Sequence, residues 1–244
     1  MSIPAARNNY FIYNVIAVCV VSVQDAIQKL AKDAVKRIKG AKVVGLGSGS
    51  TVTQIVREMA KLPAKASMEF IPSSLQIRLE AEQCELKLGD EARISDIDIV
   101  FDGADQIDCK FNMIKGGGGA LFREKILISA AKQVVIAADA SKFVQSFSRP
   151  VPIEVHPMAR TTVGKTLSEM GGMPVLRTLE KGYPFVTENG NIVYDTAFAR
   201  LYEPKTKEIE LKSIPGVIEV GLFTRRADVY YRAKSDGTFD SITF

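Results

Sequence analysis

The sequence has little of the residues on which many active sites depend: one histidine, three cysteines and no tryptophan among 244 residues. Cys19, Cys84 and Cys109 lie far apart and match no zinc-ligand spacing, and their odd number argues against a disulfide framework. His156 stands between apolar residues and a proline, which favours a structural role over membership of a Ser-His-Asp triad. Any chemistry must therefore depend mostly on carboxylates, lysines and the backbone.

A strong excess of one sign of charge is also missing, because 32 basic and 28 acidic residues give a net charge of +4. The basic residues are not clustered as they are in most nucleic-acid binding proteins, so we expect no nucleic-acid partner. The balance suits an anionic small-molecule substrate. A hydrophobic content of 46% is too high for a disordered chain, and the length allows one large domain or two modest ones.

No hydrophobic run is long enough to cross a membrane. The longest, residues 11–23 (FIYNVIAVCVVSV), falls short of the roughly 20 residues that a transmembrane helix needs. It resembles a signal-peptide core, but only Arg7 flanks it and no clear cleavage site follows. We therefore expect residues 1–21 to be an apolar extension or the product of a mis-assigned start, and the protein to be cytoplasmic and without a membrane partner.

Short apolar strands alternate with helices over residues 22–150, which predicts an α/β fold with a mostly parallel sheet and helices on both faces. The residue pattern places strands and helices alternately along this part of the chain. Strands are expected at 42–46, 68–71, 97–101 and 134–138, and helices at 22–39, 51–61, 75–84 and 120–131.

The pattern changes after Pro150, where prolines become frequent. A helix is expected at 161–170, and two short strands at 185–187 and 192–194 flank an Asn-Gly turn typical of a β-hairpin. These signals predict a smaller α+β domain over residues 151–220. The tail, residues 221–244, has strand character and is expected to return to the first sheet.

Four segments fall at the carboxyl ends of predicted strands, where open α/β sheets bind ligands. In residues 45–51 (GLGSGST), glycines turn backbone N–H groups inward, and a helix N-terminus and the hydroxyls of Ser48, Ser50 and Thr51 favour a phosphate. The segment is neither a P-loop nor a GxGxxG motif, since position 50 is serine. A tight turn without a ligand is the alternative.

The second segment, Asp102-Gly-Ala-Asp105, carries two carboxylates that could bind sugar hydroxyls, hold a metal, or act as acid and base. In the third, Lys115 precedes four glycines that allow a ligand to approach closely, and Glu124 lies in the second turn of the following helix. The fourth, residues 139–142, places Lys142 where it could meet a phosphate.

In order and spacing these segments (GLGSGST, DGAD, KGGGGALFREK and DASK) resemble ribose-5-phosphate isomerase of the A type, as do ENGNIVYD and PGVIEVGLF. The resemblance covers residues 22–244. It implies a Rossmann-like domain formed by residues 22–150 and 221–244, a smaller α+β domain, a homodimer or homotetramer, and no redox cofactor. It also implies interconversion of D-ribose 5-phosphate and D-ribulose 5-phosphate through an enediolate, a step of the pentose phosphate pathway.

The resemblance assigns roles to individual residues. By the resemblance, Glu124 would accept the proton. On chemical grounds, Lys115 could stabilise the developing oxyanion, and Asp102 or Asp105 could assist opening of the sugar ring. No metal, flavin or nicotinamide would be needed. The residues expected to bind the substrate are Ser48, Gly49, Ser50 and Thr51 at the phosphate, Asp102, Gly103, Ala104, Asp105, Lys115, Gly116, Gly117 and Gly118 at the sugar, and Lys142.

Two other functions remain open. A sugar-phosphate sensor would keep the phosphate-binding turn without the base, but the segment before residue 22 is too short for the helix-turn-helix domain of such regulators. A nicotinamide-dependent dehydrogenase would need a third glycine and an acidic residue about 20 positions beyond the loop. Glu69 meets the second requirement, whereas Ser50 fails the first.

Overall fold

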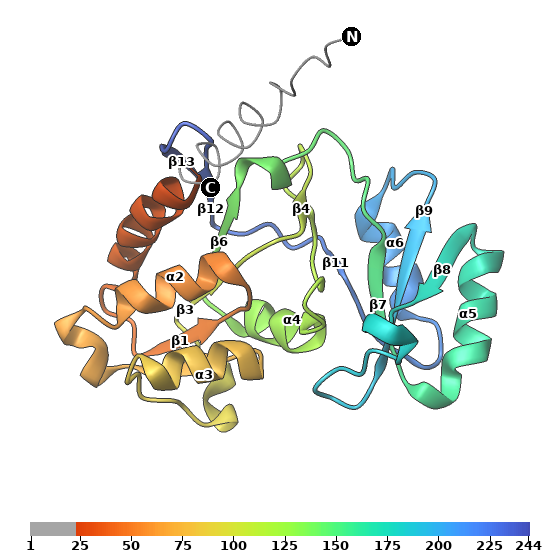
Figure 1. Ribbon diagram of the computed structural model, residues 1–244, viewed down its shortest axis with the longest axis horizontal. Helices are drawn as coiled ribbons and strands as arrows, with labels where there is room; N and C mark the ends of the chain where they lie inside the picture. The colour runs from red at the N-terminus through yellow and green to blue at the C-terminus, as the bar shows by residue number, and fades with distance from the viewer. Residues whose placement is uncertain (1–22) are drawn as a thin grey trace, which may run out of the picture.

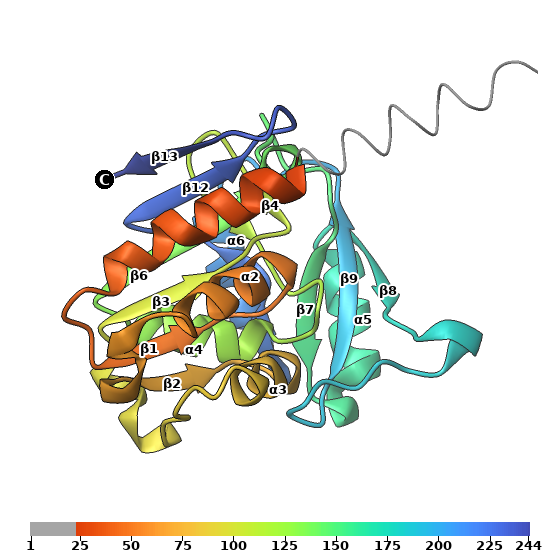
Figure 2. The same ribbon diagram turned by 60° about the vertical axis from the view of Figure 1, so that its left-hand side comes forward.

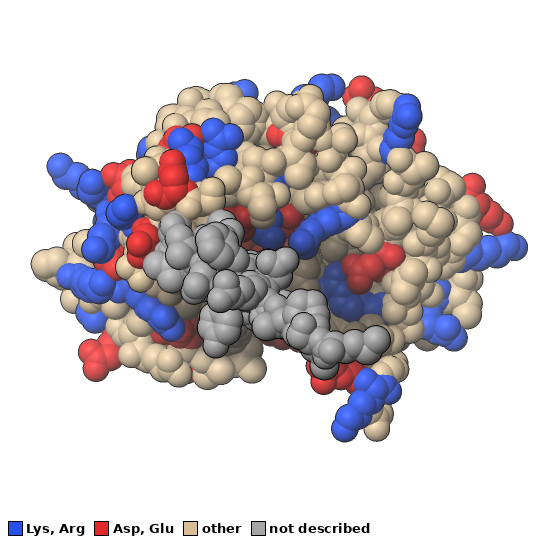
Figure 3. Space-filling view, turned by 45° about the horizontal axis from the view of Figure 1, so that its top comes forward, with Lys and Arg blue, Asp and Glu red and all other residues tan. Residues whose placement is uncertain are grey.

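Residues 23–244 are described by the structure, a computed structural model. The predicted apolar extension, residues 1–21, and the first residue of the helix predicted at 22–39 lie outside this range. Within it, no helix is both long enough and apolar enough to span a membrane. Basic and acidic side chains are interspersed on the face of the molecule shown in Figure 3.

The larger sheet has six strands in the order β13–β12–β6–β3–β1–β2. All neighbours are parallel except the edge strand β13, which runs antiparallel to β12, so the predicted mostly parallel sheet is confirmed. The strands are β1 (Val43–Leu46), β2 (Glu69–Pro72), β3 (Ile99–Asp102), β6 (Gln133–Asp139), β12 (Val229–Ala233) and β13 (Phe239–Thr243).

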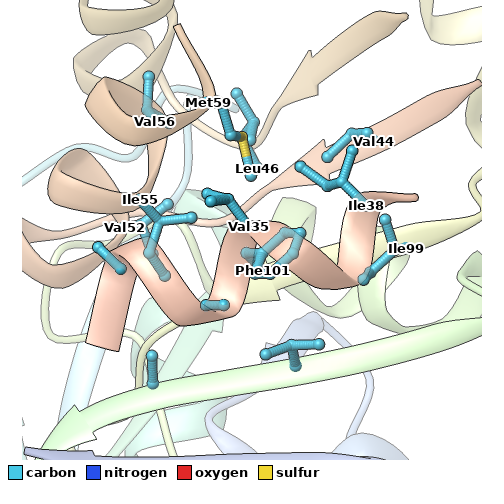
Figure 4. Packing of buried hydrophobic residues seen from close by; sticks show 14 of the residues in the cluster. Val35, Ile38, Val44, Leu46, Val52, Ile55, Val56, Met59, Ile99 and Phe101 are labelled. Atoms are coloured by element: carbon cyan, nitrogen blue, oxygen red, sulfur yellow. The ribbon is translucent and has the colours of Figure 1, made fainter. Parts of the chain in front are cut away.

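Helices cover both faces of this sheet (Figures 1 and 2). One face carries a helix at residues 23–34 that continues into η1 (Val35–Ile38), together with α2 (Ser50–Met59) and α3 (Leu75–Gln83). In Figure 4 side chains of η1 and α2 converge on Leu46 of β1 and Phe101 of β3. The opposite face packs against α4 (Leu121–Ala130). Short 3-10 helices complete this part: η2 (Pro63–Ser67), η3 (Glu91–Asp96) and η4 (Ala140–Lys142).

A second, antiparallel sheet forms the right-hand part of Figure 1, with the strand order β10–β7–β9–β8. Its apolar side packs against two helices in a separate core. The elements are β7 (Val151–Val155), η5 (Pro157–Ala159), α5 (Arg160–Glu169), β8 (Gly172–Leu176), η6 (Glu180–Gly182), β9 (Ile192–Phe198), α6 (Pro204–Lys212) and β10 (Val217–Val220). A three-stranded ribbon, β11–β5–β4, joins the two parts through β4 (Gln106–Ile107), β5 (Met113–Ile114) and β11 (Leu222–Phe223).

Some predicted elements differ from the observed ones. Residues 185–187 make a single bridge, Val186 to Ile192, rather than a strand, because β9 pairs along its length with β7 and β8 instead. Residues 220–223 do not return to the first sheet: Val220 ends β10, and β11 pairs with β5. The rest of the tail does return, as β12 and β13.

Candidate active site

A cleft of about 850 Å³ lies where β1, β3 and β6 of the larger sheet end. Nearly all the residues predicted from the sequence to bind a ligand line this cleft. They are Ser48, Gly49, Ser50, Thr51, Gly103, Ala104, Asp105, Lys115, Gly116, Gly117, Gly118, Glu124 and Lys142. Asp102 is the exception, because it is completely buried behind the lining residues.

The turn between β1 and α2 forms one edge of the cleft. Gly49 precedes α2 and has a φ of 97°, a backbone conformation that favours glycine. The first hydrogen bond of the helix runs from the N–H of Thr53 to the carbonyl of Gly49. The N–H groups before Thr53 have no partner within the helix and form its positive end. Together with the hydroxyls of Ser50 and Thr51, they make a site for an anion, whereas the Ser48 hydroxyl, which also lines the cleft, donates its hydrogen to Glu124.

Gly47 in the same turn is required for a different reason. A Cβ at this position would lie 2.1 Å from Cγ of Asp102, so no side chain fits. The turn therefore passes directly over Asp102, whose Oδ1 accepts hydrogen bonds from the N–H of Ser48 at 3.4 Å and of Gly103 at 2.7 Å.

Three charged side chains meet at the bottom of the cleft. The Lys115 ammonium lies 2.9 Å from Oδ1 of Asp102 and 3.3 Å from Oε2 of Glu124, and it donates to the carbonyl of Gly103 at 2.6 Å. All three side chains are at most 4% exposed. Each comes from a different element: Asp102 ends β3, Lys115 follows β5, and Glu124 lies in α4. Glu124 is in the first turn of this helix rather than the predicted second, because α4 begins at Leu121.

The two oxygens of Glu124 have different environments. Oε1 accepts a hydrogen bond from the Ser48 hydroxyl at 2.6 Å. Oε2 is buried, and although the Lys115 ammonium is near, it accepts no hydrogen bond. One oxygen thus fixes the carboxylate while the other is free to take a proton.

The cluster has two carboxyl groups for one ammonium, and the pKa values of Asp102 and Lys115 reflect this. Burial and the neighbouring charge of Glu124 raise the pKa of Asp102 to about 7, and Lys115 offsets only part of this effect. Burial alone would lower the pKa of Lys115, but the charges of Asp102 and Glu124 together raise it above its usual value. The ammonium is therefore a permanent positive charge, and Asp102 can hold a proton near neutral pH.

Residues 116–119, here called the glycine loop, form the opposite wall of the cleft. Gly117 donates its N–H to Oδ2 of Asp105 at 2.8 Å, and a Cβ on Gly117 would lie 2.7 Å from the other oxygen of that carboxylate. Gly116 has a φ of 103°, in the region that favours glycine. Lys142, from η4, completes the site, with its ammonium 4.0 Å from Asp139.

The cleft also has residues that the sequence patterns did not indicate. Gln76 on α3 accepts a hydrogen bond from the Gly49 N–H at 3.3 Å and donates to the Thr53 hydroxyl at 3.1 Å. Glu188, from the hairpin of the smaller domain, accepts from the N–H of Leu75 at the start of α3 at 2.7 Å. Gln76 belongs to no recognisable motif, and Glu188 begins the ENGNIVYD segment, which gave no sign that it would reach the cleft, so only the fold brings them to the site.

Two residues weighed in the sequence lie away from the cleft. His156 is exposed and its ring accepts a hydrogen bond from the N–H of Met158 at the start of η5, which is a capping role. Glu69 is the first residue of β2, at the opposite end of the sheet from the cleft, where it pairs with Lys87 and Arg93. It is therefore not placed to bind the ribose of a dinucleotide. Among residues 23–244, no group of three or more His, Cys, Asp or Glu side chains is arranged to hold a metal ion.

Comparisons with known proteins agree on one family. The family model described as ribose 5-phosphate isomerase A (phosphoriboisomerase A) matches residues 69–237. Ribose-5-phosphate isomerase A of Haloarcula marismortui is 40% identical over 214 residues, which cover 87% of this chain and 93% of the relative.

Solved structures agree. Ribose 5-phosphate isomerase A of Methanocaldococcus jannaschii superposes with a TM-score of 0.84 at 36% identity, covering 91% of this chain and 99% of the other. A D-ribose-5-phosphate isomerase in complex with phospho-erythronic acid superposes with a TM-score of 0.80 at 32% identity, covering 89% and 98%.

Proposed function

This chain belongs to the ribose 5-phosphate isomerase A family and interconverts ribose 5-phosphate and ribulose 5-phosphate in the pentose phosphate pathway, and we propose that Glu124 is its catalytic base. The observation that carries this proposal is the free Oε2 of Glu124, which is buried in the wall of the cleft without a hydrogen-bond partner.

The substrate's phosphate binds at residues 48–51, at the N-terminus of α2, with Lys142 as a further cation. Its carbon chain then extends along the cleft towards Glu124 and Lys115. The complex of a related isomerase with phospho-erythronic acid supports a phosphate-bearing ligand for this chain. Anchoring the phosphate supplies binding energy that positions the reacting carbons.

The reaction moves one proton between adjacent carbons. Glu124 takes the proton from C2 of the open-chain aldose, which leaves an enediolate. A proton then passes from the hydroxyl on C2 to the oxygen on C1, and Glu124 returns its proton to C1 to give the ketose. The Lys115 ammonium, 3.3 Å from Glu124, stabilises the negative charge that develops on the substrate oxygens. Asp105 lines the cleft and is the better placed of the two aspartates to assist ring opening, whereas Asp102 acts from behind on Lys115.

The variant Glu124→Gln tests this assignment. It keeps the shape of the side chain and the oxygen that accepts from Ser48, but it removes the base, so kcat should fall by about 10²–10⁴-fold. Affinity for ribose 5-phosphate, measured by calorimetry, should stay close to that of the wild type. A kcat near the wild-type value would contradict the proposal.

We also propose, from the family resemblance, that the chain is cytoplasmic and assembles as a homodimer or homotetramer. The edge strand β8 supports assembly, because Met173 and Val175 are about two-thirds exposed on it. Light scattering of the purified protein measures the assembly directly, and a monomer at working concentration would contradict it.

A further inference from the structure

Arg177, contributed by the smaller domain, contacts the glycine loop of the cleft, and we propose that it is a positioning residue for the reaction. It would hold the peptide groups of Gly116 and Gly117 in the orientation that directs the N–H of Gly117 to Asp105 and the N–H of Gly118 towards the cleft. The proposal rests on the proposed function, because it assigns a role to a loop of that active site.

The guanidinium of Arg177 is fixed on both sides. Its Nε and Nη2 donate to the two carboxylate oxygens of Asp195 on β9, at 2.8 and 2.5 Å. Its Nη1 donates to the carbonyls of Gly116 at 2.8 Å and Gly117 at 3.2 Å. The side chain is 14% exposed. A bidentate Arg–carboxylate pair has a defined geometry. The pair with Asp195 therefore fixes the direction in which Nη1 of Arg177 points at the carbonyls of the loop.

The planarity of the peptide bond carries this orientation across the loop. In a trans peptide the C=O and the following N–H point in opposite directions. The carbonyl of Gly116 faces Arg177, and the N–H of Gly117 accordingly points the other way, where it donates to Asp105 at 2.8 Å. The carbonyl of Gly117 also faces Arg177, which directs the N–H of Gly118 away from Arg177, on the side of the cleft that Gly118 lines.

A ring contact supports the same loop. The Arg177 guanidinium lies 5.6 Å from the centre of the Phe185 ring, and this ring also packs against Gly119. A Cβ on Gly119 would lie 2.4 Å from the ring, and its φ of 83° also favours glycine. The fourth glycine of the run is thus explained by the residues that surround Arg177.

Four consecutive glycines have little conformational preference of their own. Besides the turn bond from the Gly119 N–H to the Gly116 carbonyl at 3.0 Å, their arrangement therefore depends on contacts from outside the loop. Asp105 restrains the loop from the larger domain, through the N–H of Gly117. Arg177 restrains it from the smaller domain, through two carbonyls. The sugar-binding wall of the cleft is therefore complete only when both domains contribute to it.

Steady-state kinetics of Arg177→Met and Arg177→Lys test the proposal, with inorganic phosphate as a competitive inhibitor. Loss of the loop orientation should lower kcat of Arg177→Met by about 10–100-fold. The inhibition constant of phosphate should stay within about twofold, because residues 48–51 do not touch Arg177. Arg177→Lys keeps the positive charge but lacks the planar guanidinium that contacts Asp195 and the loop together, so its kcat should be intermediate between those of the wild type and Arg177→Met.

The matched control is Arg93→Met. Arg93 also donates to two carboxylates, Asp96 and Glu69, but it lies at the opposite end of the sheet from the cleft. It should leave kcat unchanged, even where it lowers the melting temperature. The proposal is overturned if Arg177→Met keeps a kcat within twofold of the wild type. An equal loss in Arg93→Met, or an equal weakening of phosphate binding in Arg177→Met, would also overturn it, since either indicates a general loss of structure.

Glu124→Gln in the same assay separates this inference from the assigned base. If Glu124→Gln turns over normally, the proposed base is wrong. If Glu124→Gln is inactive while Arg177→Met retains its kcat, only the role of Arg177 is wrong. Should Arg177→Met fail to fold, the kcat and phosphate inhibition of Arg177→Lys decide the question by the same criteria.

Discussion

Two clusters in this molecule have the same composition, one lysine and two carboxylates, but very different environments. In the catalytic cluster, Lys115 meets Asp102 and Glu124. In the second cluster, Lys125 meets Glu208 at 2.6 Å and Glu219 at 3.1 Å. Both lysines also lie near the ring of Phe223, at 5.6 and 4.4 Å from its centre, so the clusters are near neighbours.

The clusters differ in how many of their polar atoms are used. Lys125 donates to the carbonyls of Val220 and Leu222 and to Glu208. The second oxygen of Glu208 accepts from the Thr224 hydroxyl at 2.5 Å, and Glu219 accepts from the N–H of Val220 and from Lys212. All four carboxylate oxygens of this cluster thus accept a hydrogen bond, whereas Oδ2 of Asp102 and Oε2 of Glu124 accept none.

This difference separates a structural ion pair from a reactive one. The Lys125 cluster joins α4, α6 and the β10–β11 segment, and its side chains keep 11–20% of their surface exposed. The Lys115 cluster is almost fully buried and leaves two carboxylate oxygens without a hydrogen bond, which costs folding free energy. A protein retains such a loss of folding free energy where the carboxylates concerned take part in the reaction.

Replacing each lysine by methionine should have the largest effect and should separate the clusters most clearly. Lys115→Met removes the charge that stabilises the enediolate, so kcat should fall by about 10²–10³-fold. Steady-state kinetics with ribose 5-phosphate measure this effect directly.

Lys125→Met is the control for Lys115→Met. It leaves the carbonyls of Val220 and Leu222 without a donor, and it should lower the free energy of unfolding by about 1–3 kcal/mol while kcat changes less than about twofold. Urea denaturation and kinetics together give both values. A large loss of kcat in Lys125→Met would show that the second cluster is not merely structural.

The sequence predicted the order of the longer strands and helices over residues 23–150 well, because apolar strands and amphipathic helices have distinct periods. It missed α6, where only Pro204 and Leu211 are buried and no apolar stripe exists. It also missed β4 and β5, since two-residue strands such as Met113–Ile114 have no detectable alternation.

For the site, glycine runs and strand-end carboxylates indicated the residues that line the cleft. The patterns did not indicate that Asp102 is buried behind the residues that line the cleft. Its burial depends on the close approach of the Gly47 backbone to the Asp102 side chain. Arg177 and Gln76 carried no local signal, since an isolated polar residue beside a strand or on a helix usually faces solvent. These contacts are made between segments far apart in the sequence, and only the fold brings them together.

The pH dependence of stability tests the burial of the catalytic cluster. The pKa of Asp102 is raised from 3.8 to about 7, so between these pH values the folded protein holds a proton that the unfolded chain has released. Stability should therefore fall as the pH rises through this window, by at most about 1.4 kcal/mol per pH unit. Below this pH window Asp102 is protonated in both the folded and the unfolded chain, and above it Asp102 is charged in both, so neither range contributes a slope.

Asp102→Asn removes this contribution, so its free energy of unfolding should fall less steeply than that of the wild type between pH 4.5 and 7. Urea denaturation at several pH values measures both slopes. Asp98, whose pKa is lowered to about 2, acts in the opposite direction but is present in both proteins. Identical slopes would mean that Asp102 is charged in the folded protein throughout this range.

The smallest expected effect comes from making the same change, carboxylate to amide, in the second cluster. In Glu208→Gln the amide oxygen can still accept from Lys125 while the amide nitrogen donates to the Thr224 hydroxyl, so both hydrogen bonds survive. Because Glu208 is 20% exposed, loss of its charge should cost only about 0.5–1 kcal/mol of stability, and kcat should not change. Urea denaturation and kinetics check both values beside Glu124→Gln, for which the opposite pattern is expected: a large loss of kcat with stability nearly unchanged. If Glu208→Gln also lost activity, an unpartnered buried oxygen would no longer distinguish the reactive carboxylate from the structural one.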